Sequence, residues 1–345
     1  MRNVLLAILY ITFPMFLFSQ NQLIMSENFA IVIHGGAGTI LKKNMTDEQE
    51  KAYQEKLQEA LDSGYAILKN GGSAIDAVEK AIVVMEDSPL FNAGKGAVYT
   101  NVATNELDAS IMDGKTLNAG AVSGVRNVKN PIKLARVVME KSEHVMLSGK
   151  GAEDFAKQYK IEMVDSAYFY NEHRLKQLNK IKDSEKIQLD HSDNDDEQGD
   201  ITEFKDSKFG TVGAVALDKH GNLAAATSTG GMTNKKFGRI GDSPIIGAGT
   251  YANNATCAVS CTGHGEFFIR NVVAYDVAAL MEYKNLSLVD AANYVVNEKL
   301  VKLGGDGGLI AIDKDGNIAM PFNTKGMYRA YKKANGESKF LIFKN

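Results

Sequence analysis

Hydroxyl side chains gather in the second half of the chain, beside glycines and at the ends of expected strands. The group consists of Thr211, Thr227, Thr229, Thr233 and Thr262. Threonine also suits strands for reasons of packing alone, so a structural role would explain most of them. A hydroxyl becomes a nucleophile when a base lies beside it. Thr211 is the strongest candidate because it follows Gly210 and opens an alternating apolar run.

The segment that precedes Gly210 indicates a second possible property of Thr211, a free α-amine. Residues 180–208 are acidic and poor in side chains that could be buried, which is typical of a disordered linker. Cleavage after such a segment would turn Thr211 into an N-terminus, whose α-amine could serve as the base for its own hydroxyl. The alternative is an ordinary loop that enters a β-strand, and the Gly-Thr pair alone favours that alternative.

Two charged residues follow the threonine-rich hairpin. Arg239 and Asp242 could form a surface ion pair of little energetic value. They could equally bind an amino acid, with the guanidinium on its α-carboxylate and the carboxylate on its α-ammonium. The residues alone leave these two interpretations even. The loop from Thr262 to Gly265 could present backbone N–H groups to a developing oxyanion.

Several other chemistries are not supported. The run HGGAGT, residues 34–39, has neither the lysine of a P-loop nor the spacing of a dinucleotide fingerprint, which indicates a tight turn near a site. His264 and Glu266 lack the second histidine of a zinc-protease helix. Cys257 and Cys261 lie too far apart on one strand to form a bridge, so we expect two buried apolar side chains.

The N-terminus has the pattern of a signal peptide. Arg2 precedes an apolar run over residues 4–18 that is interrupted by Pro14, which favours an h-region over a membrane span. We therefore expect a signal peptide over residues 1–20 and a secreted or periplasmic protein, with an uncleaved anchor as the alternative. The net charge of −3 and the absence of a basic, aromatic-rich run argue against a nucleic-acid partner.

The elements that must position these residues are hairpins and capped helices. Strand-turn-strand patterns cover residues 107–125, 212–229 and 309–321, and ALDKHGNLAA in the second is echoed by AIDKDGNIAM in the third. Helices are expected from Thr46 to Gly71, from Ser73 to about Glu86, from Pro131 to Met139, from Glu266 to about Glu282 and from Ser287 to Leu303. This order lacks the alternation of a doubly wound sheet and predicts an α+β fold, with two antiparallel-rich sheets packed face to face and helices outside.

Long motifs identify a family resemblance. HGGAGT, PLFNAGKGA, LDASIMDG, the block that begins with GTVGAVALDKHGN, CTGHGE and PFNTKGMYRA resemble the plant-type L-asparaginase / isoaspartyl peptidase family (asparaginase 2 family) of N-terminal-nucleophile hydrolases. The resemblance covers most of the chain after the signal segment. HGGAG and PLFNAGKG are similar to the asparaginase branch rather than to the glycosylasparaginases. His264 stands where the bacterial isoaspartyl peptidases more usually have threonine, and in this it is like the glycosylasparaginases.

The resemblance implies a chain organisation. The fold would be the αββα sandwich of N-terminal-nucleophile hydrolases. Self-cleavage between Gly210 and Thr211 would give an α subunit over residues 21–210 and a β subunit over residues 211–345, which together form one structural domain. Two αβ units would assemble into an (αβ)2 heterotetramer.

The resemblance also implies roles for residues. Thr211 would be the nucleophile, Thr229 would orient it, and Thr262 and Gly263 would form the oxyanion hole with help from Asn92. Arg239 and Asp242 would hold the α-carboxylate and α-amine of the substrate, beside backbone groups of Gly231 and Gly263.

The family resemblance implies a metal ion with a structural role only. No cofactor would be needed for catalysis. The loop that begins at Met85 and ends at Lys95 resembles the sodium-binding loop of the family. A structural Na⁺ would bind its backbone carbonyls, with no metal bound by side chains.

The implied activity is hydrolysis of β-aspartyl (isoaspartyl) peptides and L-asparagine through a threonyl acyl-enzyme, with release of L-aspartate. Two alternatives remain. One is a glycosylasparaginase, and the other is a periplasmic amino-acid or peptide binding protein that keeps Arg239 and Asp242 without turnover.

Overall fold

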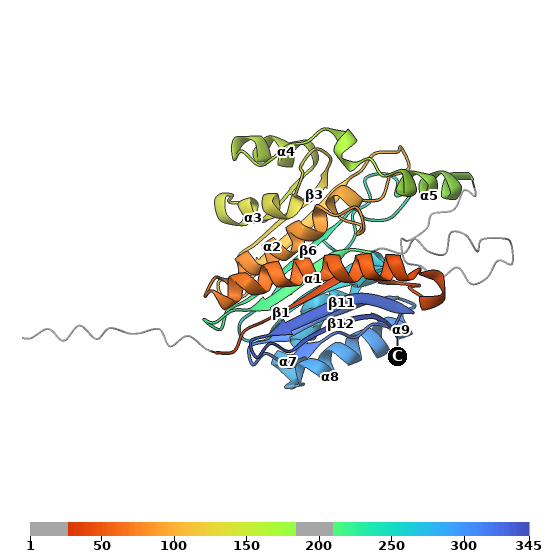
Figure 1. The fold of residues 1–345 in the computed structure, drawn as a ribbon. Helices are drawn as coiled ribbons and strands as arrows, with labels where there is room; N and C mark the ends of the chain where they lie inside the picture. Colours follow the sequence, from red (N-terminus) through yellow and green to blue (C-terminus); the bar gives the residue numbers. More distant parts are fainter. Residues whose placement is uncertain (1–26, 184–209, 345) are drawn as a thin grey trace, which may run out of the picture.

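The computed structural model describes residues 27–183 and 210–344, in which two β-sheets lie face to face with helices on their outer sides (Figure 1). This arrangement confirms the predicted sandwich. The signal peptide expected over residues 1–20 and most of the expected linker lie outside the described residues. None of the described helices is both long and apolar enough to span a membrane.

The larger sheet has the strand order β12-β11-β1-β5-β6-β2-β3-β4, and every neighbouring pair is antiparallel except β3 and β4. Its strands are β1 (Ala30–Gly38), β2 (Leu107–Asp113), β3 (Ala119–Val125), β4 (Met146–Ser148), β5 (Val212–Leu217), β6 (Leu223–Thr229), β11 (Gly326–Lys333) and β12 (Ser338–Phe343).

The smaller sheet has the order β10-β9-β8-β7 and is antiparallel throughout. Its strands are β7 (Thr250–Ala252), β8 (Cys257–Gly263), β9 (Gly307–Asp313) and β10 (Ile318–Ala319). The two hairpins with similar sequences, β5–β6 and β9–β10, therefore contribute one to each sheet.

Helices cover the outer face of each sheet. Those that pack on or beside the larger sheet are α1 (Asp47–Lys69), α2 (Ala74–Glu86), α3 (Pro131–Lys141) and α4 (Gly149–Gln158), followed by α5 (Glu172–Asp183). Those on the side of the smaller sheet are α6 (Gly265–Asn271), α7 (Val273–Lys284), α8 (Leu288–Asn293), a π-helical segment (Tyr294–Lys299) and α9 (Leu300–Lys302). Short 3₁₀ turns lie at Lys42–Asn44, Gly94–Gly96 and Ser166–Phe169.

Local sequence signals set most helix ends. Thr46 and Gln49 form the expected capping box at α1, and the hydroxyls of Ser73 and Ser287 accept N-cap hydrogen bonds at α2 and α8. Pro131 occupies the first turn of α3, although the Asn130 side chain forms no capping bond there. The predicted helix ends are thus largely confirmed.

Three expectations are corrected. The helix expected from Glu266 to about Glu282 is divided into α6 and α7, because Val272 adopts a left-handed conformation with φ of 50°. Residues 180–183, assigned above to the linker, continue α5. Strand β1 does not stop at the HGG turn but continues to Gly38, with an irregularity between His34 and Gly36.

A fourth correction concerns the loop expected from Met85 to Lys95, because both of its ends belong to helical elements. Met85 is fully buried and lies in the last turn of α2, which ends at Glu86. Lys95 lies in the 3₁₀ turn Gly94–Gly96, and its Nζ is 5.4 Å from the centre of the Tyr168 ring, a cation–π contact. The irregular backbone is therefore confined to residues 87–93.

The inner layer, between the two sheets, is apolar over half of its length. From the larger sheet it contains Ala30, Val32, Met112, Val215, Leu217, Leu223 and Ala225, and from the smaller sheet Ala252, Ala258, Ile310 and Ile312. Along the same strands the side chains then become polar.

Candidate active site

The polar half of the inner layer follows from strand alternation. On the face that carries Val32, Val215 and Ala225, the next residues along the strands are His34, Gly213 and Thr227. Ser110 of β2 lies opposite Thr227. Because every second side chain of a strand points to the same face, the strands pass together from apolar packing to hydrogen-bonding groups.

Thr211 lies at the start of β5 and is buried, with 7% of its surface exposed. Its hydroxyl donates to the Thr229 hydroxyl at 3.1 Å and lies 3.4 Å from the Ser243 hydroxyl. Thr229 Oγ1 also accepts a hydrogen bond of 3.0 Å from the backbone N–H of Gly231. The two threonines predicted to act together are therefore in contact.

Gly36 of β1 lies in close contact with Gly210, the residue before Thr211. Gly36 has φ of +114°, and a Cβ added to it would lie 2.4 Å from the backbone N of Gly210. No side chain larger than hydrogen fits there. The HGGAGT segment thus packs against the Gly210–Thr211 junction, as expected for a tight backbone segment near a site.

Asn92 supports the turn that follows Thr229. Its amide donates to the Gly231 carbonyl at 2.8 Å, and its carbonyl oxygen accepts from the N–H of Val98 at 3.0 Å. Its main-chain carbonyl also accepts from Gly230 at 3.0 Å. The side chain lies beside the site but is engaged with the backbone, so its contribution to an oxyanion hole stays a prediction.

Thr262 and Gly263 end β8, opposite Gly308 and Gly307 of β9. The side chain of Thr262 is fully buried, and its hydroxyl oxygen has no hydrogen-bond partner in the described part of the chain. A buried hydroxyl without a partner is costly. Such a group is available to a ligand or to an oxyanion.

Arg239 is bound by a carboxylate that the sequence did not single out as its partner. Its Nε and Nη2 donate to the two carboxylate oxygens of Glu266 at 2.9 and 2.8 Å. The interpretation of Arg239 and Asp242 as a surface ion pair is therefore wrong. Nη1 of Arg239 makes no hydrogen bond to any described residue, so the terminal edge of the guanidinium stays available for a second bidentate contact.

Asp242 lies close to the same guanidinium but is buried, with 3% of its surface exposed. Burial raises the pKa of its carboxyl to about 7, and the nearby charge of Arg239 opposes the rise. Its Oδ2 has no partner among the described residues. A Cβ on Gly265 would lie 2.8 Å from Arg239 Nη2 and 3.0 Å from Asp242 Oδ1, so both side chains pack closely against this glycine.

Glu266 and His264 lie beside the Arg239 guanidinium. His264 Nε2 lies 3.3 Å from Glu266 Oε2. Partial burial raises the pKa of Glu266, but the hydrogen bonds and the charge of Arg239, with smaller contributions from neighbouring groups, together leave it below its usual value. The sequence pointed to Glu266 only as a helix start and as a rejected zinc ligand; the available signal for a binding role was an acidic residue directly after a glycine-containing loop.

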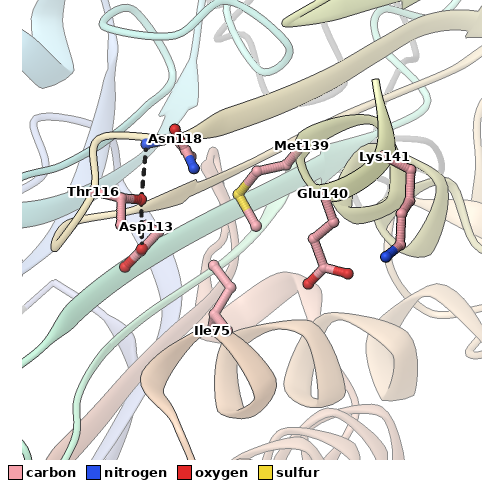
Figure 2. A pocket seen from close by; sticks show the side chains of 7 residues that line it. All are labelled: Ile75, Asp113, Thr116, Asn118, Met139, Glu140 and Lys141. Carbon is pink, nitrogen blue, oxygen red and sulfur yellow. Dashed lines mark hydrogen bonds between the residues drawn. The ribbon is translucent and has the colours of Figure 1, made fainter. Parts of the chain in front are cut away.

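A surface hollow of about 390 Å³ lies elsewhere. It is lined by Ile75, Asp113, Thr116, Asn118, Met139, Glu140 and Lys141, and Figure 2 shows the hydrogen bond from Thr116 to the Asp113 carboxylate. In β2, Asp108 lies opposite Thr229 whereas Asp113 lies opposite Ala224. The hollow is therefore at the other end of the strands from Thr211 and Thr229 and contains none of the predicted site residues.

Comparison with known proteins is consistent with this geometry. The sequence profile of the family described as Asparaginase matches residues 27–342. The isoaspartyl peptidase of Salmonella typhimurium is 56% identical over 301 residues, which cover 87% of this chain and 94% of the relative. A probable isoaspartyl peptidase/L-asparaginase of Arabidopsis thaliana is 42% identical over 91% of this chain and 99% of the relative. The isoaspartyl peptidase/L-asparaginase of Mus musculus is 44% identical, with 87% and 86% covered.

Proposed function

The chain belongs to the asparaginase family, and from that premise we propose that it is an autoprocessing threonine amidohydrolase for β-aspartyl (isoaspartyl) peptides and L-asparagine. One observation carries the proposal. Asp242 has a buried carboxylate oxygen without a partner among the described residues, and its side chain and that of Arg239 lie against the same glycine, Gly265. An α-amino acid zwitterion carries the two charges complementary to these side chains.

Self-cleavage would generate the nucleophile. The Thr211 hydroxyl attacks the Gly210 carbonyl, the Gly210–Thr211 C–N bond breaks, and the acyl group moves from nitrogen to oxygen. Water then hydrolyses the ester and leaves a Gly210 carboxylate, a free Thr211 hydroxyl and a free α-amine. The hydrogen bond to Thr229 and the close approach of Gly36 to Gly210 support this step, since both restrict the reacting atoms.

The free α-amine would then act as the base. Its unperturbed pKa of about 8 lies close enough to neutrality for proton transfer from the Thr211 hydroxyl. Thr229 accepts a hydrogen bond from that hydroxyl and one from the Gly231 N–H, so it fixes the direction of attack.

Substrate would bind by its α-amino acid end. The free edge of Arg239 pairs with the α-carboxylate, Asp242 pairs with the α-ammonium, and backbone groups of Gly231 and Gly263 complete the contacts. Thr211 attacks the side-chain carbonyl, and Thr262 with Gly263 stabilises the oxyanion, with Asn92 as the helper. The amine leaves with a proton, and hydrolysis of the acyl-enzyme releases L-aspartate.

We also propose a structural Na⁺ on the backbone between Met85 and Lys95. A Cβ on Gly94 would lie 2.4 Å from the Glu86 carbonyl, and a Cβ on Gly96 would lie 2.1 Å from the Phe91 carbonyl, so each glycine lets a backbone carbonyl approach closely. The Glu86 side chain is turned elsewhere, because it accepts from the Ser228 hydroxyl at 2.6 Å. Carbonyl oxygens are suitable ligands for a hard cation, so the backbone of this loop would hold the ion.

We extend the proposal to chain organisation. Cleavage would give α and β subunits that stay packed in one domain, since β1 of the former lies between β5 and β11 of the latter. Two αβ units would form the (αβ)2 assembly, and a leader over residues 1–20 would direct the protein to the periplasm or the medium. Light scattering and intact mass of the purified protein test both statements.

The activity is tested with the purified protein, a β-aspartyl dipeptide, L-asparagine and GlcNAc-asparagine side by side. We expect L-aspartate from the first two, and none from Thr211→Ala, while Thr211→Ser retains part of the activity because a hydroxyl remains. Turnover of GlcNAc-asparagine alone would identify a glycosylasparaginase. Binding of aspartate without turnover of any substrate would identify a binding protein and refute the proposal.

A further inference from the structure

A chain of hydrogen bonds runs between the two sheets, one row of side chains away from Thr211 and Thr229. Its members are His34, Ser260, Thr227, Thr250, Ser110 and Ser243, which we call the hydroxyl chain. His34 Nε2 lies 3.1 Å from Ser260 Oγ, which lies 2.6 Å from Thr227 Oγ1. Thr250 donates to Thr227 at 2.5 Å.

The far end of the hydroxyl chain is a backbone carbonyl. The Ser110 hydroxyl lies 2.8 Å from Thr250 Oγ1 and donates to the Ser243 carbonyl at 2.6 Å. Thr250 reaches the same carbonyl at 3.5 Å. Ser243 lies in the loop between β6 and β7, which also carries Arg239 and Asp242. The chain therefore ties the two sheets to the loop that carries the proposed substrate contacts.

The fold makes room for this arrangement. A Cβ on Gly213 would lie 2.1 Å from both His34 Nε2 and Ser260 Oγ, so the absence of a side chain near the start of β5 admits the imidazole and the hydroxyl. All six members are buried, with at most 1% of their surface exposed. Buried polar groups that satisfy one another hold a single arrangement, because breaking one contact leaves a polar group without a partner.

One end of the hydroxyl chain reaches the hydroxyl of Thr211. The Ser243 hydroxyl lies 3.4 Å from Thr211 Oγ1. At the other end, burial lowers the pKa of His34 to about 3, so the imidazole is neutral at physiological pH. The network therefore contacts Thr211 beside its hydroxyl and ends in an uncharged ring.

We propose that the hydroxyl chain positions Thr211 for attack, with Ser243 as the positioning residue that contacts its hydroxyl. This inference rests on the proposed function. The chain does not deliver a proton to Thr211, because its last link is the carbonyl of Ser243, which accepts a hydrogen bond but has no proton to pass on. Its effect is to keep the Thr211 hydroxyl directed at Thr229.

The arrangement of donors also assigns a tautomer to His34. We assign the Thr227 hydroxyl proton to the Gly249 carbonyl at 3.2 Å, which makes Ser260 the donor in its 2.6 Å contact with Thr227. Ser260 then accepts from His34, which must carry its proton on Nε2. Nitrogen-15 NMR of labelled histidine should find one neutral Nε2–H ring that does not titrate between pH 5 and 8.

The test breaks the hydroxyl chain in its middle. Thr227→Val keeps the shape of the side chain but removes its hydroxyl, and Thr227→Ser restores the hydroxyl. Thr256→Val is the matched control, because Thr256 is also buried but lies beyond the opposite end of β8 from Thr262. Self-cleavage is followed by mass, and kcat and KM for a β-aspartyl dipeptide are measured per mole of free N-terminal threonine.

We expect Thr227→Val to slow self-cleavage and to lower kcat about tenfold with KM changed less than twofold, since misplacement of a nucleophile affects the reacting step. Thr227→Ser should recover most of the loss, and Thr256→Val should match the unsubstituted protein. The Thr227→Val protein should also lose the single Nε2–H signal of His34. If Thr227→Val does not fold, Ser110→Ala, which releases the Ser243 carbonyl, must show the same loss in kcat.

An unchanged kcat in folded Thr227→Val or Ser110→Ala would overturn the inference, as would an Nδ1–H tautomer of His34 in the unsubstituted protein. These results differ from failure of the proposed function. If that function is wrong, the unsubstituted protein itself shows no turnover, whereas failure of this inference leaves full turnover in both the unsubstituted protein and the variants.

Discussion

The two halves of the layer between the sheets are built on the same strands but contain opposite kinds of side chain. In one half, Leu217, Leu223 and Ile312 pack together without polar groups. In the other, Thr211, Thr227 and Ser260 fill the same layer with hydroxyls. The apolar half gains free energy from burial alone, whereas the polar half depends on matched hydrogen bonds.

The polar half also contains groups that the protein leaves unmatched. Asp242 Oδ2 and Thr262 Oγ1 are buried without a partner in the described residues. Each such group destabilises the folded chain unless a ligand satisfies it. The contrast indicates that the apolar half stabilises the fold. The unpartnered groups of the polar half lower the free energy of unfolding but are available to bind substrate and to take part in the reaction. Substitutions in the two halves should therefore have separable effects.

The largest effect is expected at Thr229. Thr229→Val removes the group that accepts from the Thr211 hydroxyl and should lower kcat about a thousandfold, a loss of the size seen when an oriented polar group is removed from a site. The melting temperature should change little, because valine fills the same volume. Thr229→Ser serves as the control. A fall in kcat accompanied by a large fall in melting temperature would contradict separate roles for the polar and apolar halves.

The reverse pattern is expected in the apolar half. Leu223→Ala should lower the free energy of unfolding by about 3 kcal/mol, because it leaves a cavity in a fully buried position. Activity per folded, cleaved molecule should stay unchanged. Denaturant titration measures the first quantity and active-site titration the second, with Leu223→Met as a control that conserves volume. A selective loss of kcat here would contradict the division of roles.

A smaller effect is expected at Asp242. Asp242→Asn keeps the shape but removes the charge proposed to pair with the substrate ammonium, so KM for L-asparagine should rise about 30-fold, as for a lost charged hydrogen bond. Asp113→Asn at the distant hollow of Figure 2 is the control and should have no effect. An unchanged KM in Asp242→Asn would show that the ammonium binds elsewhere.

The smallest effect is a dependence on pH. The pKa of Asp242 in the free protein is raised to about 7, so below pH 7 its carboxyl is mostly protonated and cannot attract an ammonium group. The value of kcat/KM should therefore fall by about tenfold between pH 8 and pH 6 and level off near the roughly 30-fold loss expected for the uncharged Asp242→Asn. The fall in kcat/KM below pH 7 should be absent in Asp242→Asn. A profile that is flat from pH 8 to pH 5 would contradict the assignment.

Sequence reasoning predicted what local signals encode. The caps at Thr46, Ser73 and Ser287 lie within three residues of the N–H groups that they bind, so they could be predicted directly. The hairpin that brings Thr211 beside Thr229 follows from one alternating pattern and one turn. The family resemblance supplied their expected roles.

The rest depends on register between distant strands. His34 and Ser260 are separated by 226 residues and meet only because β1 and β8 belong to facing sheets. The partner of Arg239 is Glu266, 27 residues away, rather than the nearer Asp242. Strands β11 and β12 were missed because their mixed charged and aromatic sequence does not alternate clearly, although Asn335-Gly336 between them is a hairpin signal that could have revealed the pair. Such contacts are set by topology, which no single segment encodes.

The most direct test of the functional proposal is N-terminal sequencing of the purified protein, combined with the masses of its fragments. We predict two chains, of which the smaller begins at Thr211 and the larger ends at Gly210, while Thr211→Ala remains a single chain. An uncut, active protein, or a cut at any other bond in an active one, would contradict the assignment of Thr211 as the nucleophile.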